Sequence, residues 1–159
     1  MPDDPLNLRL ARELFSWAWR ADWQAWCPPE WPTWADYTLR QDSPRFLGEL
    51  FVVLATHATT FDDRGAPHVP PYTGSPAATA LVWAWLTARP AVHRIQLMRR
   101  AADLDTGVGA ETVCLIQVWA TGCRVDVEDV GHGSEAVALC RAALAAAAAL
   151  REEGPGGAV

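Results

Sequence analysis

Tryptophan is the residue type in this chain with the greatest capacity for molecular recognition. The chain has nine tryptophans in 159 residues, and six of them lie between positions 17 and 34. Trp31 and Trp34 belong to a proline-rich segment, 28–34, which is predicted to be a loop. An indole offers a large apolar area and a π face, so this loop could stack a nucleobase or hold an apolar patch of a partner. The alternative for both rings is burial in the core, which is also expected for the other four tryptophans of this region: Trp17, Trp19, Trp23 and Trp26.

Arginine supplies a second candidate site. The 13 basic residues are all arginines, and the formal net charge of the chain is -6. In this acidic chain one local concentration of positive charge stands out, and it consists of Arg89, Arg94, Arg99 and Arg100. A guanidinium can bind phosphate through two parallel hydrogen bonds, so Arg94 and Arg99 are predicted to bind an anionic group. The alternative is a solvated edge whose charge is balanced by distant carboxylates.

Metal-binding and catalytic signatures are weak or absent in the sequence. One predicted loop carries a mixed set of possible ligands for a divalent ion: His57, Asp62, Asp63 and His68. The chain has neither an H-x-x-x-H nor a C-x-x-C spacing, so no metal and no cofactor are predicted. It also lacks a Walker loop, a G-x-G-x-x-G and a G-x-S-x-G motif, which favours a protein without catalytic activity. An enzyme remains an alternative hypothesis, in which His57, Asp62 and His132 would carry the chemistry.

Composition excludes several further classes of protein. A sequence pI near 5.1 argues against a general nucleic-acid binder, which usually needs a basic face. No run approaches 18 consecutive apolar residues, and the first residues are acidic where a secretory signal would be positive. We therefore expect a cytoplasmic protein that does not cross a membrane. Its four cysteines are expected to be reduced and mostly buried, with Cys114 and Cys123 approaching each other across a hairpin.

The N-terminal half of the chain is predicted to be helical. Leucines at helical spacing predict a helix over 5–26, which ends where Cys27 is followed by two prolines. Ser43 and Pro44 provide an N-cap and a first helical residue for a helix that runs to about 58. A loop is expected over 59–74, followed by a helix that starts at Ser75-Pro76 and ends before Pro90.

The C-terminal half changes to the period of β-strands. Strands are predicted over 92–98, 111–119 and 123–128, with a helix that Ser134 caps and that starts at Glu135. This order predicts an α+β fold, in which a small, mainly antiparallel three-stranded sheet is packed with helices behind a helical N-terminal half. Residues 1–153 are expected to form one domain, and 154–159 a disordered tail.

Several segments of the chain resemble a known family, the phage ABA sandwich domain. They are Val69-Pro70-Pro71-Tyr72-Thr73, the alanine-rich stretch Ala77–Ala88, the predicted strands, and the helix that runs from Ser134-Glu135-Ala136 to Ala143-Leu144. The stretch from Asn7 to Leu14 is similar to the family's opening helix, so the resemblance covers residues 5–19 and 69–150. The chain departs from the family pattern in two places. Gly74 replaces an acidic residue, and 24–60 has no counterpart and is a possible family-specific insertion.

The resemblance implies a three-layer α-β-α sandwich in the host cytoplasm, with no established chemistry. By analogy with other small phage proteins, the chain is expected to be a phage or prophage accessory protein that binds without catalysis and sequesters a small nucleotide immune signal, which is an anti-defence function. The alternative is an inhibitor or adaptor that contacts a host protein through its Trp/Pro-rich surface. The predicted ligand-binding residues are Trp31, Trp34, Tyr72, Arg94 and Arg99.

Self-association is a further expectation from the sequence. The alanine-rich stretch 142–150 offers a small-residue helix face that would let a second helix approach closely. A two-fold homodimer would also cover apolar area left exposed by the large aromatic side chains. The alternative is that the alanines pack on the sheet of their own chain.

Overall fold

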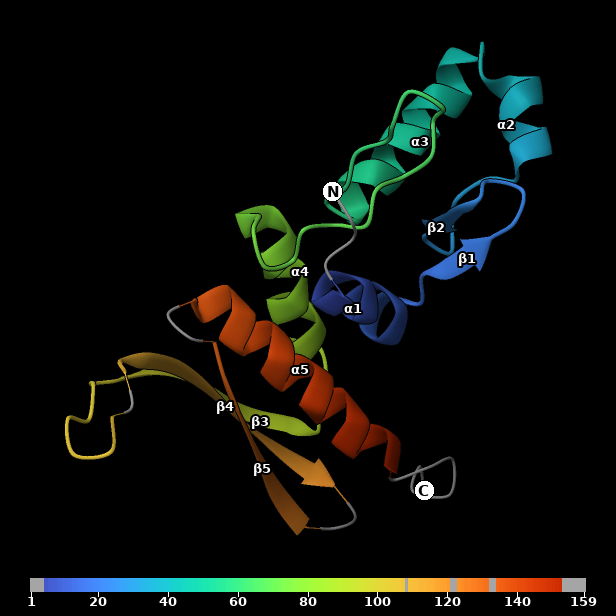
Figure 1. Ribbon diagram of the computed structural model, residues 1–159. Helices are drawn as coiled ribbons and strands as arrows, with labels where there is room; N and C mark the ends of the chain where they lie inside the picture. Colours follow the sequence, from blue (N-terminus) through green and yellow to red (C-terminus); the bar gives the residue numbers. More distant parts are fainter. Residues whose placement is uncertain (1–4, 108, 121–122, 132–133, 153–159) are drawn as a thin grey trace. The chain divides into compact units, whose positions relative to one another are not determined.

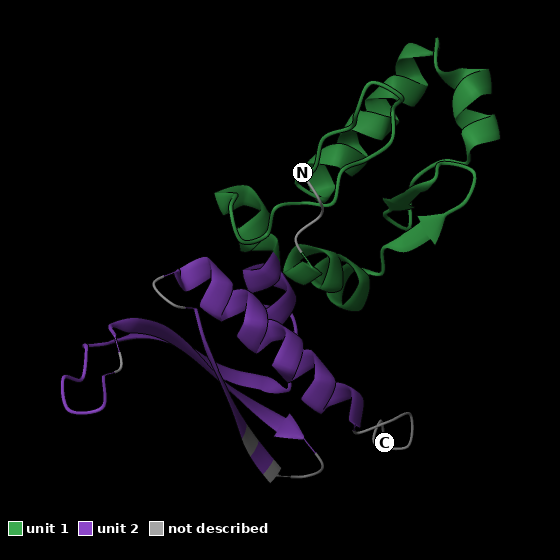
Figure 2. Ribbon diagram, viewed as in Figure 1, with its two compact units in different colours: residues 1–81 green, residues 82–159 purple. Residues whose placement is uncertain are grey.

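The computed structural model describes residues 5–107, 109–120, 123–131 and 134–152. Within these residues the chain forms five helices and two antiparallel sheets, which confirms the α+β class. It divides into two compact units, unit 1 (residues 1–81) and unit 2 (residues 82–159), shown in Figure 2. The predicted single domain over 1–153 stays a prediction, and the predicted tail lies outside the described residues.

Unit 1 begins with a helix that is shorter than the sequence predicts. Helix α1 (Pro5–Phe15) ends where Ser16 adopts a left-handed backbone with φ 59°, so the predicted helix over 5–26 is wrong beyond Phe15. The chain then forms an antiparallel hairpin of β1 (Ala18–Arg20) and β2 (Ala25–Cys27), as Figure 1 shows. Trp19 and Trp26 are register partners across this hairpin. Trp19 and Trp26 are seven residues apart, a spacing that also places two residues on one face of a helix. The sequence pattern therefore predicts a helix where the chain forms a hairpin.

Three further helices of unit 1 start at side-chain caps. Thr33 caps the unpredicted α2 (Trp34–Arg40) by accepting a hydrogen bond from the backbone N–H of Asp36. Ser43 caps α3 (Pro44–Thr56) in the same way, which confirms this predicted helix start. Helix α4 (Pro76–Thr87) also starts where predicted, and the boundary between the two units falls inside it.

The core of unit 1 joins the hairpin, α3 and the loop that follows α3. Its buried members come from positions far apart in the chain: Trp23, Cys27, Trp31, Leu50, Leu54 and Ala66. The four tryptophans expected in the core do not share one environment. Trp17 and Trp23 are buried, Trp26 is half-buried, and Trp19 is 55% exposed, so the prediction is wrong for Trp19.

Unit 2 contains the predicted sheet and final helix. Strands β3 (Val92–Arg100), β4 (Glu111–Ala120) and β5 (Cys123–Val130) pair in the order β3-β4-β5, and α5 (Glu135–Glu152) packs on the sheet (Figure 1). Ser134 caps α5 by accepting a hydrogen bond from the backbone N–H of Val137. Gly131 is required before this cap, because a Cβ there would overlap the carbonyl oxygen of Ser134. The finer prediction of α-β-α layering stays a prediction.

The alanine face of α5 is already occupied within the chain. Four of the alanines that were expected to admit a second helix are buried: Ala142, Ala143, Ala146 and Ala147. They belong to the helix that packs against β4 and β5, so these four alanines are not available for a dimer. Self-association stays a prediction, because Ala148 of the same stretch is exposed and Ala145 and Ala149 are half-buried.

Three cysteines lie in the interior of the protein. Cys27 and Cys114 are buried free thiols, and Cys140 is buried as well. The sheet register pairs Cys114 with Asp129 and the backbone of Cys123 with Ala120, so the predicted approach of Cys114 and Cys123 across the hairpin is wrong. Among the helices that the structure describes, none is both long and apolar enough to cross a bilayer.

Candidate functional site

The three aromatic residues predicted to bind a ligand differ greatly in exposure. Trp31 is 3% exposed and packs in the core of unit 1. Tyr72 is 0% exposed and stacks on Phe15, with ring centroids 5.2 Å apart. Trp34 is 42% exposed, although it lies in the same segment as Trp31. Of the three rings, therefore, only that of Trp34 is accessible to a ligand as the protein stands.

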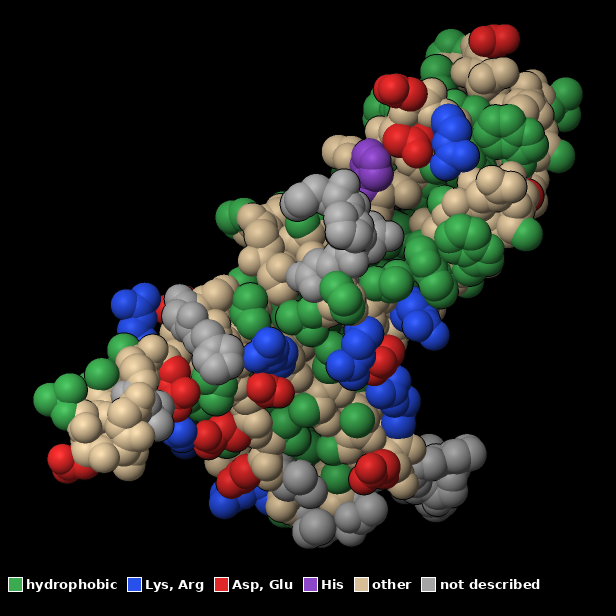
Figure 3. Space-filling model, viewed as in Figure 1, with side chains coloured by type: hydrophobic (Ala, Val, Ile, Leu, Met, Phe, Trp, Pro, Cys, Tyr) green, Lys and Arg blue, Asp and Glu red, His purple; other side chains and the backbone are tan. Residues whose placement is uncertain are grey.

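The predicted arginine cluster does not form one anion site. Strand register pairs Arg94 with Gln117 and Arg99 with Thr112, and the odd separation places the two arginines on opposite faces of the sheet. Arg99 lies 3.5 Å from the carboxylate of Glu135. Figure 3 shows acidic and basic side chains interspersed on the visible face of unit 2. The structure therefore favours the alternative of a charge-balanced edge.

The two outer arginines of this cluster are also engaged. The guanidinium of Arg100 lies 2.7 Å from the carboxylate of Glu128 and 3.6 Å from that of Glu111. The guanidinium of Arg89 lies over the ring of Trp85, 3.4 Å from its centroid, and burial lowers the pKa of this group. Three of the four arginines therefore already have partners within the chain.

Unit 1 contains a pocket of about 490 Å³ that combines aromatic, amide and charged side chains. We call it the aromatic pocket, and its lining residues are Asp22, Trp23, Gln24, Trp34, Tyr37, Gln41, Asp63 and Arg64. Its volume lies within the range of about 300–1,000 Å³ that is usual for small-molecule sites. One predicted ligand-binding residue, Trp34, belongs to it.

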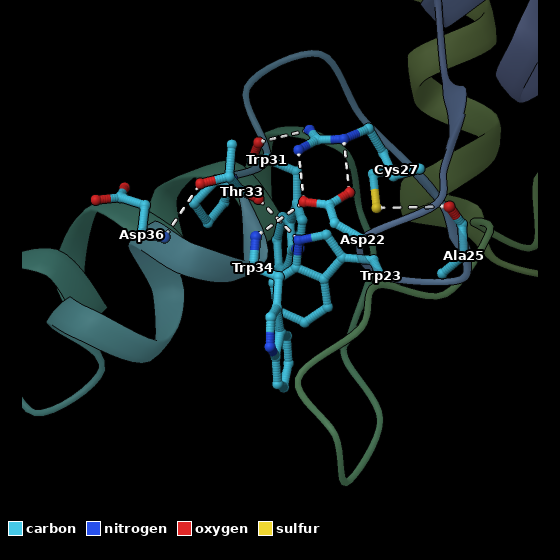
Figure 4. Close-up of polar contacts among 10 residues, drawn as sticks. Asp22, Trp23, Ala25, Cys27, Trp31, Thr33, Trp34 and Asp36 are labelled. Atoms are coloured by element: carbon cyan, nitrogen blue, oxygen red, sulfur yellow. Dashed lines mark hydrogen bonds and ion pairs between the residues drawn. The ribbon is translucent and has the colours of Figure 1, made fainter.

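Asp22 fixes one wall of the aromatic pocket. Its carboxylate accepts a hydrogen bond of 2.9 Å from the backbone N–H of Trp34 and forms an ion pair of 3.0 Å with Arg20 (Figure 4). Arg20 also donates to the carbonyl oxygen of Trp31. The backbone hydrogen bond from Trp34, followed by the contact with Arg20, holds the pKa of Asp22 below its usual value. An ionised Asp22 therefore ties the turn of the hairpin to the first residue of α2.

Three aromatic rings form a compact cluster on this wall. The ring centroids of Trp23 and Trp34 lie 4.9 Å apart at an interplanar angle of 88°. The ring of Tyr37 lies 5.1 Å from that of Trp23 and stacks at 5.9 Å on that of Trp34. These separations are those of rings in direct contact, so no planar ligand fits between them. A ligand would instead stack on the exposed part of Trp34.

A tight turn supplies a further part of the pocket lining. The carboxylate of Asp62 accepts hydrogen bonds from the backbone N–H groups of Arg64 and Ala66, and this bonding shapes the turn. Gly65 has φ 83°, and a Cβ at this position would lie 2.7 Å from the phenol oxygen of Tyr37. Glycine is therefore needed for both the backbone conformation and the approach of Tyr37. This packing brings Asp63 and Arg64 to the aromatic cluster.

Most of the aromatic pocket was not identified from the sequence. Asp63 was considered only as a metal ligand, and Gln24, Tyr37, Gln41 and Arg64 were not considered. Two local signals were present. Trp34 and Tyr37 have the i, i+3 spacing that places side chains on one helix face, and an Asp-Asp-Arg-Gly sequence is typical of a tight polar turn. Neither signal indicates that the two segments meet.

Three residues of the enzyme and metal hypotheses, His57, Asp62 and His68, have structural partners. His57 is buried, lies 2.8 Å from the carboxylate of Glu30, and contacts the ring of Trp17 edge-on. Asp62 shapes its turn, and His68 lies within hydrogen-bonding distance of Thr60. In the part of the chain that the structure describes, no group of three or more His, Cys, Asp or Glu side chains could hold a metal. His132 lies outside that part.

Comparison with protein-family models, curated proteins and solved structures finds no match. The resemblance to the phage ABA sandwich domain therefore has the quoted sequence segments as its only support.

Proposed function

We propose that this protein acts by occupancy, and that it binds a small nucleotide-like ligand in the aromatic pocket without catalysing a reaction. The observation that carries the proposal is that the half-exposed Trp34 and the arginine Arg64 line the same pocket. Indoles stack on nucleobases, and guanidinium groups bind phosphate. In the phage setting that the resemblance implies, the ligand would be an immune signal sequestered in the host cytoplasm.

The lining of the aromatic pocket supports binding over catalysis. Gln24 and Gln41 bring amides, each of which can both donate and accept hydrogen bonds to the edge of a base. The described lining residues include no serine, cysteine or histidine, so they offer no Ser–His or Cys–His pair of nucleophile and general base. The carboxylate of Asp22 is already occupied by Trp34 and Arg20.

A protein partner is the second candidate. Apolar side chains lie exposed on α3 and on the loop that follows it, where Phe51 is 57% exposed and contacts the ring of Phe61 at 6.4 Å. Val52 is also exposed beside Phe51 in the sequence. Such an area would suit an inhibitor or adaptor that covers apolar surface on a host protein.

The test of small-ligand binding is a matched pair of tryptophan variants. Trp34→Ala removes the exposed ring of the aromatic pocket, and Trp119→Ala removes a ring of similar exposure (46%) in unit 2. We expect Trp34→Ala to weaken the binding of nucleosides and nucleotides, measured by isothermal titration calorimetry, by about 1–3 kcal/mol, the usual contribution of one stacked base. Trp119→Ala should bind as the unmodified chain does.

Two further measurements make this test decisive. The melting temperature of each variant shows whether loss of binding follows loss of folding. Native mass spectrometry of the protein purified from its own host would reveal a retained ligand or a protein partner. Equal binding by both tryptophan variants would exclude the aromatic pocket, and a captured protein lost on Phe51→Ser would favour the second candidate.

A further inference from the structure

The charge around the aromatic pocket limits which nucleotides it can hold. Arg64 is the one cationic side chain among the described lining residues, while Asp22 and Asp63 are both acidic. Asp22 is neutralised by its ion pair with Arg20. Asp63 has no such compensation among the described contacts, and the carboxylate of Asp62 lies next to it in the chain. The pocket therefore offers one guanidinium to an anion, and its lining also contains two carboxylates.

Arg64 is free enough to exchange its present contact for a ligand. Its side chain is 62% exposed, and its guanidinium lies 3.8 Å from the carboxylate of Asp62, which is a loose contact. The other oxygen of Asp62 is engaged by the backbone of the turn. A phosphate that approached Arg64 could form two parallel hydrogen bonds with it without disturbing the turn.

A second and third phosphate would meet a different environment. Each would add negative charge near Asp63 and Asp62, with no further cation among the described lining residues. Like charges at short range repel, and unpaired charge is a common means of rejecting a related ligand. The amides of Gln24 and Gln41 suit the neutral part of a ligand and offer nothing specific to additional phosphates.

We infer that the aromatic pocket takes a ligand that joins one planar base to a single phosphate, and that it rejects polyphosphates. The inference rests on the proposed function and adds the charge class of the ligand. The base stacks on Trp34, the phosphate pairs with Arg64, and Asp63 excludes ligands of higher charge.

The test is a titration of the full chain with three probes at constant ionic strength: adenosine, its 5′-monophosphate and its 5′-triphosphate, with the guanine, cytosine and uracil series in parallel. We expect at least one monophosphate to bind best, and its triphosphate to bind at least tenfold more weakly. Arg64→Gln should lower the affinity for the monophosphate to the affinity for the nucleoside. Tighter binding of the triphosphate than of the monophosphate would overturn the inference.

A charge variant isolates the role of Asp63. Asp63→Asn should improve triphosphate binding several-fold relative to monophosphate binding, while Asp105→Asn, which makes the same change in an exposed loop of unit 2, should leave the ratio unaltered. An equal effect of both variants would show that only net charge matters and would overturn the inference. If no probe binds, or if Trp34→Ala leaves binding intact, the proposed function itself fails.

Discussion

The buried tryptophans of unit 1 differ in how their indole N–H groups are satisfied. The Nε1–H of Trp23 donates a hydrogen bond of 2.8 Å to the carbonyl oxygen of Pro32. The Nε1 atoms of Trp17 and Trp31 are buried and have no hydrogen-bond partner in the part of the chain that the structure describes. A buried donor without an acceptor costs about 1–3 kcal/mol of stability. The same residue type therefore has a different energetic role at each position.

Phenylalanine substitutions should reveal this difference. Trp23→Phe removes a hydrogen bond and leaves the carbonyl oxygen of Pro32 without its donor, whereas Trp31→Phe removes an unsatisfied N–H together with part of the ring. We expect the free energy of unfolding, measured in urea, to fall more for Trp23→Phe than for Trp31→Phe, by about 1–2 kcal/mol. Both variants delete the same atoms, so each serves as the other's control. An equal or larger loss for Trp31→Phe would contradict the assignment.

The hypothesis that the ring is accessible to a ligand is correct for Trp34 and wrong for Trp31. The two share one proline-rich segment, and nothing local distinguishes them. The difference arises because the backbone N–H of Trp31 bonds to the carbonyl of Pro28 and its ring joins the core with Leu50, whereas Trp34 starts α2. Packing partners distant in sequence decided the outcome, and periodicity contains no information about them.

Elements whose signals are local were predicted well. Ser43, Ser75 and Ser134 mark helix starts because an N-cap needs only a few consecutive residues. The strands of unit 2 follow from their alternation and β-branched content. The β1–β2 hairpin was missed because Ser16 and Gln24 adopt positive φ angles without being glycines, which no composition rule anticipates.

The turn at Gly65 yields a prediction at the level of elements. Gly65 and Gly107 both have positive φ, but a Cβ would approach Tyr37 at Gly65 and would meet nothing within 4 Å at Gly107. Alanine at either position should lower the free energy of unfolding by about 1–2 kcal/mol, because a residue with a Cβ is strained at positive φ. Gly65→Ala should cost more, because Tyr37 must move, and it should also weaken ligand binding in the aromatic pocket.

Unfolding in urea and calorimetric titration measure the two consequences of Gly65→Ala separately. Gly107→Ala is the matched control, since it makes the same chemical change at a positive φ in open space. If the two variants lose equal stability, the contact between the turn and α2 does not contribute to the fold.

On the scale of the whole molecule, the charge distribution could not be inferred from the sequence. Neighbouring arginines indicated a basic site, yet Arg99 and Arg100 contact Glu135 and Glu128, which lie about thirty residues further along the chain. Sheet pairing and the packing of α5 create these contacts, and neither is visible in a linear pattern of charge. The cationic residue that does reach an aromatic pocket, Arg64, is isolated in sequence.

Thiol reactivity provides a prediction for the whole protein. Burial raises the pKa of both Cys27 and Cys114 to about 11. At pH 8 only about one thiol in a thousand would be ionised at this pKa, against about a quarter for a free cysteine, and the thiolate is the reactive form. We expect iodoacetamide to leave both residues unmodified in the native protein and to alkylate both in urea, as mass spectrometry of peptides would show. Rapid native alkylation of Cys27 would contradict the burial of the unit 1 core.

The tryptophan contacts of unit 1 also have an optical consequence. Three indole pairs have centroids 4.9 to 6.1 Å apart, namely Trp19–Trp26, Trp23–Trp31 and Trp23–Trp34, and all belong to unit 1. Transition dipoles this close couple as excitons, which produces a pair of circular-dichroism bands of opposite sign near the peptide region. Among the described ring contacts, unit 2 has no such indole pair. The intensity of this pair of bands should therefore follow the thermal unfolding of unit 1, whereas the helical circular-dichroism signal comes from both units.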